Sequence, residues 1–163
     1  MSSGDVAGSS INFAYNPGTW DDSGTQGTIR GTTIDRTWDA ILLADKAQAT
    51  VENNILRTSN TGVLVGFYDT ASGETPVSPA VVATISGNTI TGNTRGIRVL
   101  DTQAATTNIN SNSIFGNSEF GVKNFDPDDI VDAASNWWGD ASGPSGSGPG
   151  TGDAVSDNVT FTP

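Results

Sequence analysis

A short phrase recurs along the chain and limits the folds that the chain can adopt. In each copy an apolar residue is followed by asparagine three positions later and by a second apolar residue five positions later. The copies are Val51-Asn54-Leu56, Ile85-Asn88-Ile90, Ile109-Asn112-Ile114 and Ala133-Asn136-Trp138, with Ile29-Thr32-Ile34 as a weaker first member in which threonine replaces asparagine. Their first residues lie 22, 34, 24 and 24 positions apart, so one interval carries about ten extra residues. A regular period of this length predicts a stack of repeated units.

Each of the first four copies is followed by glycine or alanine and a short apolar segment. These segments are Ala40–Leu43, Gly62–Val65, Gly96–Val99 and Gly121–Asn124. Their length, the 20 glycines and the abundant Thr, Ser and Asn favour strands and turns over helices. One unit cannot bury its apolar face alone, but units stacked about 4.8 Å apart bury a continuous column. The chain is therefore predicted to be an all-β solenoid.

The asparagine of the phrase falls where the chain must turn between two strands. Asparagine tolerates left-handed backbone angles, and its side-chain amide can bond to an equivalent amide in the next unit. We therefore expect Asn54, Asn88, Asn112 and Asn136 to form a structural ladder with no ligand role.

Two sets of motifs resemble the parallel β-helix repeat family of pectate-lyase-like and bacterial or archaeal surface proteins. The first is the pair of phrases Ile85-Ser-Gly-Asn-Thr-Ile90 and Ile109-Asn-Ser-Asn-Ser-Ile114. The second is Ala134-Ser-Asn-Trp-Trp-Gly-Asp-Ala-Ser-Gly-Pro144 with Gly150-Thr-Gly-Asp-Ala-Val155 and Val159-Thr-Phe-Thr-Pro163, which is similar to the segment that closes such solenoids. The resemblance covers residues 27–163 and implies a fold more firmly than an activity, because this scaffold carries many functions.

The resemblance implies a right-handed parallel β-helix of about five rungs with a C-terminal cap, in a single domain over residues 1–163. Residues 1–26 are expected to form an N-terminal cap or partial rung, residues 27–131 the repeat rungs, and residues 132–163 the last rung and the capping segment. Trp137 and Trp138 are expected to plug the last rung, with Ser142–Gly152 wrapping the open edge; the alternative is that one of the two indoles stacks on the face of a sugar ring. The family setting implies an extracellular or cell-surface prokaryotic module of a longer multidomain protein.

Composition excludes several classes of function. The net charge of −11 would repel nucleic acids and anionic bilayers, and the acidity fits a high-salt habitat, cation binding or simple solubility. The chain has no cysteine and no histidine, which removes thiol chemistry, Cys/His zinc sites and Ser-His nucleophile pairs. No apolar run approaches the roughly 18 residues of a membrane span.

Two cations are predicted to lie next to each other on an outer strand face. Alternation that points Ile97 and Val122 inward places Leu42, Leu64, Arg98 and Lys123 in one outward column, with Leu100 and Phe125 farther along. Arg98 and Lys123 are therefore hypothesised to clamp a uronate carboxylate, and they are weak candidates for catalysis in a lyase. The alternative is that they neutralise Asp101, Asp126 and Asp128 at the surface.

An acidic loop follows the last of these strands. Asp126, Asp128 and Asp129, with Asp132 nearby, offer the oxygen ligands that calcium prefers, so calcium is the one cofactor that the sequence indicates. The alternative is a solvated acidic turn, because the loop lacks the spacing of a known calcium motif.

Aromatic residues supply further candidates for ligand contact. Tyr68, Phe125 and Trp38 are predicted to stack on the face of a sugar ring. Tyr68 belongs to the insertion Phe67–Pro79, and insertions in solenoids tend to collect on the functional face.

Three hypotheses for function follow. The first is a non-catalytic structural or adhesive surface module that binds a polysaccharide or cell-surface glycan. The second is a polysaccharide lyase or epimerase acting on an acidic polysaccharide. The third is an ice- or mineral-binding protein, for which Thr28, Thr50, Thr84 and Thr107 would have to form a flat array.

Overall fold

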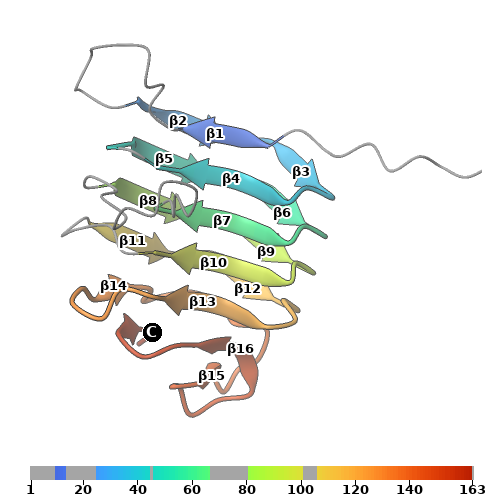
Figure 1. Ribbon diagram of the computed structural model, residues 1–163. Coiled ribbons are helices and arrows are strands. Elements are labelled where there is room, and N and C mark those ends of the chain that lie inside the picture. Colours follow the sequence, from blue (N-terminus) through green and yellow to red (C-terminus); the bar gives the residue numbers. More distant parts are fainter. Residues whose placement is uncertain (1–9, 14–24, 45, 67–80, 101–105, 163) are drawn as a thin grey trace, which may run out of the picture.

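The computed structural model describes residues 10–13, 25–44, 46–66, 81–100 and 106–162, and these residues form strands and turns with no helix. The strands lie in three sheets in which every pairing described is parallel (Figure 1). Sheet A has the order β1 (Ile11–Phe13), β4 (Asp39–Leu43), β7 (Thr61–Val65), β10 (Arg95–Val99), β13 (Phe120–Asn124), β16 (Gly152–Val155), β15 (Pro144–Gly146).

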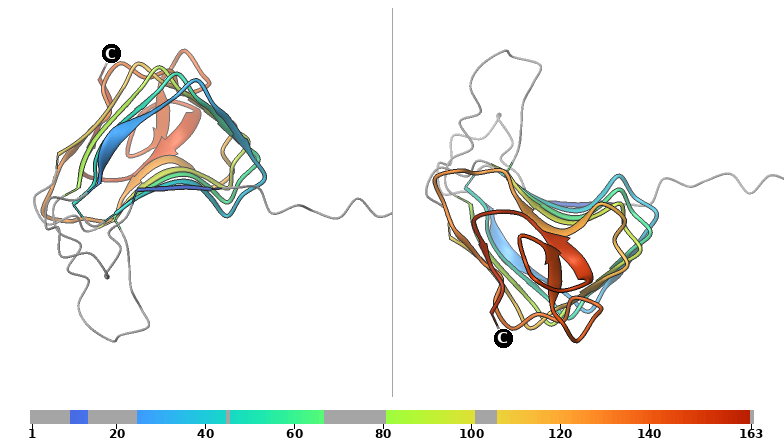
Figure 2. Two further views of the ribbon diagram at one scale, coloured as in Figure 1. Left: turned by 90° about the horizontal axis from the view of Figure 1, so that it is seen from above. Right: turned by 90° about the horizontal axis from the view of Figure 1, so that it is seen from below.

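The other two sheets are built from the strands between those of sheet A. Sheet B has the order β17 (Val159–Thr160), β14 (Val131–Asp132), β11 (Thr107–Asn110), β8 (Val82–Ser86), β5 (Gln48–Glu52), β2 (Gln26–Arg30). Sheet C has the order β12 (Ser113–Phe115), β9 (Thr89–Thr91), β6 (Ile55–Arg57), β3 (Thr33–Asp35). Each of the four coils from β2 to β13 thus adds one strand to sheet B, then one to sheet C, then one to sheet A. Viewed along the axis, successive coils superimpose (Figure 2). This is an all-β solenoid, as the repeat predicts, and a parallel β-helix, as the family resemblance implies.

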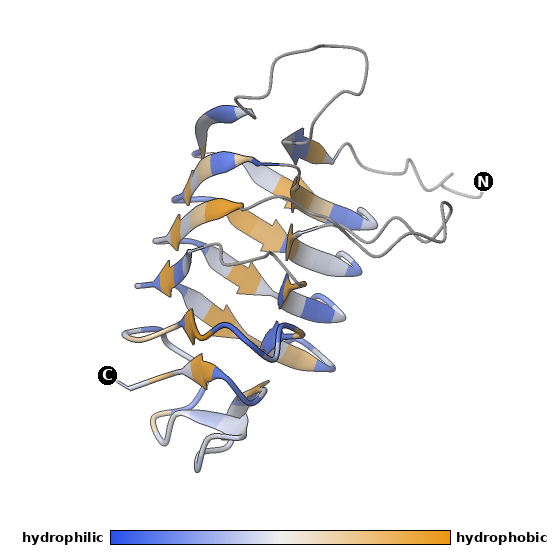
Figure 3. Ribbon diagram, turned by 60° about the vertical axis from the view of Figure 1, so that its left-hand side comes forward, coloured by the Kyte–Doolittle hydropathy of each residue, from blue (hydrophilic) through white to orange (hydrophobic). Residues whose placement is uncertain are grey.

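The apolar residues of the recurring phrase form the core. Its first residue pairs from strand to strand along sheet B, in the column Ile29, Val51, Ile85, Ile109. Its second apolar residue does the same along sheet C, in the column Ile34, Leu56, Ile90, Ile114. Hydrophobic positions therefore recur at the same place in each coil (Figure 3). All eight side chains are at most 6% exposed, which confirms that the spacing of the phrase reports the inward face.

The predicted asparagine ladder is present and buried. Nδ2 of Asn54 donates to Oδ1 of Asn88, Nδ2 of Asn88 to Oδ1 of Asn112, and Nδ2 of Asn112 to Oδ1 of Asn136. Each Oδ1 also accepts the backbone N–H of the preceding asparagine, at 2.9 to 3.0 Å. The ladder therefore fixes the turn between sheets B and C in every coil.

Glycine is the second residue of β7, β10 and β13 in sheet A because neighbouring coils approach closely there. A Cβ built on Gly96 would lie 2.2 Å from the carbonyl oxygen of Gly121, and one on Gly62 would lie 2.7 Å from that of Gly96. No side chain fits these gaps without moving the backbone. The first coil carries Ala40 at the equivalent position, and Ala40 is fully buried.

The C-terminal end is closed by the predicted capping segment, with one correction. Trp138 is 3% exposed and plugs the last coil, whereas Trp137 is 48% exposed. The prediction that both indoles form the plug is wrong for Trp137, because consecutive residues of an extended segment point to opposite sides. The wrapping segment adds β15 and β16 to sheet A, so the loop covers the open edge by strand pairing.

Candidate functional site

Arg98 and Lys123 lie side by side on the outer face of sheet A. The register pairs Leu42 with Leu64, Leu64 with Arg98, and Arg98 with Lys123, so these four side chains form the predicted outward column. Strands in one sheet lie about 4.8 Å apart, so the two cations are neighbours on consecutive coils. Like charges directly opposite each other on a sheet destabilise the fold, and this pair therefore needs an explanation.

Aromatic rings contact both cations. The guanidinium carbon of Arg98 lies 5.3 Å from the centroid of the Phe125 ring, and Lys123 Nζ lies 4.7 Å from it. Lys123 Nζ also lies 5.7 Å from the centroid of the Phe120 ring. These distances are within the range of cation–π attraction, worth about 0.5 to 1 kcal/mol each at exposed sites. Phe125 is 43% exposed, so its ring both orients the cations and faces solvent.

No carboxylate of the described residues lies within ion-pair distance of Arg98 or Lys123. The ion pairs in this part of the chain join Arg36 and Arg57 to Asp35, and Arg95 to Glu119. Asp126 accepts the backbone N–H of Asp128 at 3.0 Å, which commits one of its oxygens to a local turn. Asp101 lies outside the described residues. Among the described residues, neither Asp126 nor Asp128 lies within ion-pair distance of the two cations.

The acidic loop is built as a turn on a buried asparagine. Asn124 stands in the inward position that Val99 has in the preceding coil. Its Oδ1 accepts the N–H of Asp126, and its Nδ2 donates to the carbonyl of Asp129. Asp126 is 5% exposed, whereas Asp128 is exposed. Among the described residues no group of three or more acidic side chains is placed to hold one metal ion, so calcium binding stays a prediction.

The remaining predicted ligand residues are not gathered at the cation pair. Trp38 is 77% exposed and immediately precedes β4, two coils from Arg98 and three from Lys123. Tyr68 lies outside the described residues, as does the insertion that contains it. The described part of the site is therefore Arg98, Lys123 and Phe125, which we call the cation cluster.

The threonine array predicted on sheet B is short. Thr28, Thr50 and Thr84 pair in one outward column. The next members of that column are Asn108 and Asp132 rather than threonine. The prediction for Thr107 is wrong, because Thr107 pairs with Ala83 on the inward side and is 5% exposed.

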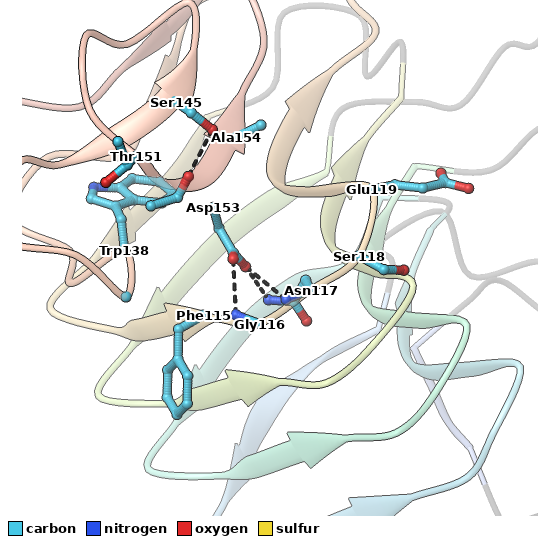
Figure 4. Close-up of a pocket in the computed structure, with 12 residues that line it drawn as sticks. Phe115, Gly116, Asn117, Ser118, Glu119, Trp138, Ser145, Thr151, Asp153 and Ala154 are labelled. Carbon is cyan, nitrogen blue, oxygen red and sulfur yellow. Dashed lines mark hydrogen bonds between the residues drawn. The ribbon is translucent and has the colours of Figure 1, made fainter.

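A second polar ladder, which the sequence reasoning missed, runs between sheets C and A. The hydroxyl of Thr37 donates to Ser59 Oγ, the N–H of Ser59 donates to Asn93 Oδ1, and Asn93 Nδ2 donates to Asn117 Oδ1. The ladder ends on Asp153, whose carboxylate accepts Asn117 Nδ2 at 2.7 Å and the N–H groups of Gly116 and Asn117 (Figure 4). The signal was present in the sequence as a polar residue five positions after the phrase residues Thr32, Asn54, Asn88 and Asn112.

The cavity around Asp153 is about 360 Å³ and is bounded by Trp138 on one side and Glu119 on the other (Figure 4). Both of its carboxylates are already engaged, because Asp153 ends the second ladder and Glu119 pairs with Arg95 at 2.7 Å. We assign this cavity to closure of the solenoid rather than to a ligand.

Stacked parallel coils with internal asparagine ladders define the class of this protein as a parallel β-helix. The chain matches the family model of the right-handed β-helix region over residues 2–136, and it belongs to that family. Comparison of the chain with curated proteins and with solved structures gives no significant match. The part of the chain that the structure describes holds no helix long and apolar enough to cross a membrane.

Proposed function

We propose that the protein is a non-catalytic extracellular β-helix module that binds acidic polysaccharide through the cation cluster. The observation that carries this proposal is that Arg98 and Lys123 stack on consecutive coils, contact the exposed ring of Phe125, and have no carboxylate partner among the described residues.

Electrostatics favours an anionic ligand at this position. Two positive charges on neighbouring strands repel each other, by about 1 to 3 kcal/mol when they lie about 5 Å apart at a protein surface, depending on the effective dielectric constant. A ligand carboxylate placed between Arg98 and Lys123 turns this repulsion into attraction to both. The rest of the protein is strongly acidic, with a net charge of −11, so an anion is held where the local field is positive.

The ring of Phe125 favours an anion that also carries an apolar surface. A uronate residue has a carboxylate for the cations and a face of C–H groups for the ring. An inorganic anion would use only the cations. Arg98 and Lys123 lie on consecutive coils, so the cation cluster extends along the solenoid axis, the direction in which we expect a chain of sugar residues to lie.

Binding rather than cleavage is supported by the groups that surround the cations. The elimination reaction of a lyase needs a base at the α-proton as well as a group that neutralises the carboxylate. Arg98 and Lys123 both stack on Phe125, and no carboxylate of the described residues lies within ion-pair distance of them.

Affinity electrophoresis in gels containing polygalacturonate tests the proposal. Arg98→Gln/Lys123→Gln should weaken retardation by about tenfold or more, because charge-assisted contacts contribute about 1.5 to 3 kcal/mol each. The matched control is Arg30→Gln/Arg36→Gln, which makes the same change in net charge on exposed residues of sheet B and of the turn after sheet C. Equal retardation of both double variants would contradict the assignment of the site.

Incubation with polygalacturonate also distinguishes the lyase hypothesis from the binding hypothesis. A rise in ultraviolet absorbance from an unsaturated uronate that is lost in the double variant would show that the cations act in catalysis rather than in binding alone.

Calcium binding, which Asp126, Asp128 and Asp129 predict, is tested by titration calorimetry with calcium chloride. Asp128→Asn is the variant that should weaken it. The short threonine column gives the ice-binding hypothesis little support, since only three threonines align.

A further inference from the structure

A second cavity opens at the C-terminal end of the solenoid, away from the cation cluster. It measures about 330 Å³, which lies in the size range of small-ligand sites. Three segments form its walls: residues 136–138 of the last coil, residues 140–144 with Pro149 of the capping loop, and residues 161–162 after β17. The cavity therefore exists only because the cap folds back over the last coil.

An exposed aromatic wall lines this cavity. Trp137 is 48% exposed although its neighbour Trp138 is 3% exposed, so the two indoles have different roles. Phe161 packs against the core and also lines the cavity. A half-exposed indole contributes little to the stability of the core, and large exposed aromatic surface in a cavity is typical of ligand contact.

A prepared hydrogen-bond acceptor lies on the same cavity. One oxygen of Asp140 accepts the hydroxyl of Ser142 at 2.6 Å and its N–H at 2.8 Å. The Ser142 hydroxyl is in turn 3.2 Å from that of Thr151. The two hydrogen bonds from Ser142 lower the pKa of Asp140, and a hydrogen bond from the Thr151 side chain lowers it by a smaller amount. The carboxylate therefore stays ionised and oriented.

The lining favours a neutral sugar over charged ligands. No lysine or arginine lines the cavity, and Asp140 is negative, so an anion is disfavoured. A quaternary ammonium ion would need several open ring faces around it, but Trp138 is 3% exposed and offers almost none. A pyranose needs one flat aromatic face for its C–H groups and one acceptor for a hydroxyl, and Trp137 with Asp140 supplies both.

We propose that this end cavity binds a neutral pyranose residue, with the sugar ring stacked on Trp137 and one hydroxyl donating to Asp140. The site is independent of the cation cluster: it lies in the cap rather than on the face of sheet A, and it takes a neutral ligand rather than an acidic one. A module with both sites would hold a glycan chain at two chemically different points.

The test uses the ¹⁵N-labelled full chain, whose four tryptophans give four indole N–H signals. Cellotetraose, maltotetraose and chitotetraose are titrated separately, and Trp137→Ala identifies the signal of Trp137. At least one sugar should shift that signal in a saturable manner. Affinity should fall about tenfold in Trp137→Ala and in Asp140→Asn, while Trp38→Ala, Asp157→Asn and Arg98→Gln/Lys123→Gln should bind as the unmodified chain does.

Three results would overturn the proposal. One is the absence of any shift of the Trp137 signal with all three sugars at millimolar concentration. Another is saturable binding of tetramethylammonium chloride at Trp137 in the absence of sugar binding. The third is unchanged affinity in Trp137→Ala, with a thermal melt showing that the variant is folded. Because the cation cluster is tested with polygalacturonate and its own double variant, either site can fail without the other.

Discussion

Replacement of Asn112 by alanine should cost about 3 kcal/mol of unfolding free energy, within a range of about 2 to 5 kcal/mol. Asn112 is 2% exposed and its amide joins three coils. Its Oδ1 accepts both the N–H and the Nδ2 of Asn88, and its Nδ2 donates to the carbonyl of Ile85 and to Asn136 Oδ1. In the variant the buried N–H of Asn88 loses its acceptor, which alone costs about 1 to 3 kcal/mol.

The matched control is Asn110→Ala, two residues away on the outward side of the same turn. Asn110 is half-buried, and its side chain makes one bond, from Nδ2 to the carbonyl of Ala134 at 3.1 Å. Its loss should cost about 0.5 to 1 kcal/mol. Urea unfolding followed by circular dichroism measures both variants, and amide hydrogen exchange should show faster exchange at Asn88 in Asn112→Ala only. A difference of less than about 1 kcal/mol between the variants, with unchanged exchange at Asn88, would refute the view that the ladder holds the coils together.

Further predictions concern glycine, the plug and pH. Gly96→Ala should prevent normal folding, judged by circular dichroism, because its Cβ would meet the Gly121 carbonyl at 2.2 Å, whereas Gly31→Ala should cost only about 1 kcal/mol for its positive φ. Trp138→Ala should lower the unfolding free energy by about 3 to 5 kcal/mol, and Trp138→Phe by much less, because the buried indole N–H has no hydrogen-bond partner to lose among the described residues. The pKa of Asp140 lies below its ordinary value of 3.8, so neutral-sugar binding should be constant from neutral pH down to about 4 and decline as the pH falls further, measured by the same titration in acetate and citrate buffers.

The fold was predictable because one residue period encodes one coil. Ile85, Asn88 and Ile90 specify a strand, a turn and a second strand in six residues, and the copy at Ile109 repeats them 24 positions later. In-register stacking then follows from burial, since a slip by one residue would turn Ile85 and Ile109 outward. The outward positions of Arg98 and Lys123 follow from the same alternation, so that pairing was also accessible from the sequence.

The closing segment was less predictable because its sequence does not continue the repeated phrase. The motif around Trp137 and Trp138 marked the cap but not which indole is buried, which depends on how the segment crosses the end of the last coil. The end cavity was invisible for the same reason: it brings Trp137 together with Asp140 and Phe161, and no local pattern links β17 to the last coil.

The polarity of the two ladders explains why they end differently. Within each ladder, an asparagine side chain donates to the ladder side chain of the next coil toward the C-terminal end. The last side chain of a ladder therefore accepts a hydrogen bond but has no further ladder side chain to which it can donate. In the first ladder this member is Asn136, whose Nδ2 is satisfied by the carbonyls of Ile109 and Ala133. In the second ladder it is Asp153, a group that only accepts and that takes three N–H donors from the coil before it. A carboxylate is suited to this position because it leaves no donor unsatisfied. Asp153 lies 36 residues after Asn117, beyond the capping loop, and a search for another asparagine at the regular period therefore misses the residue that completes the ladder.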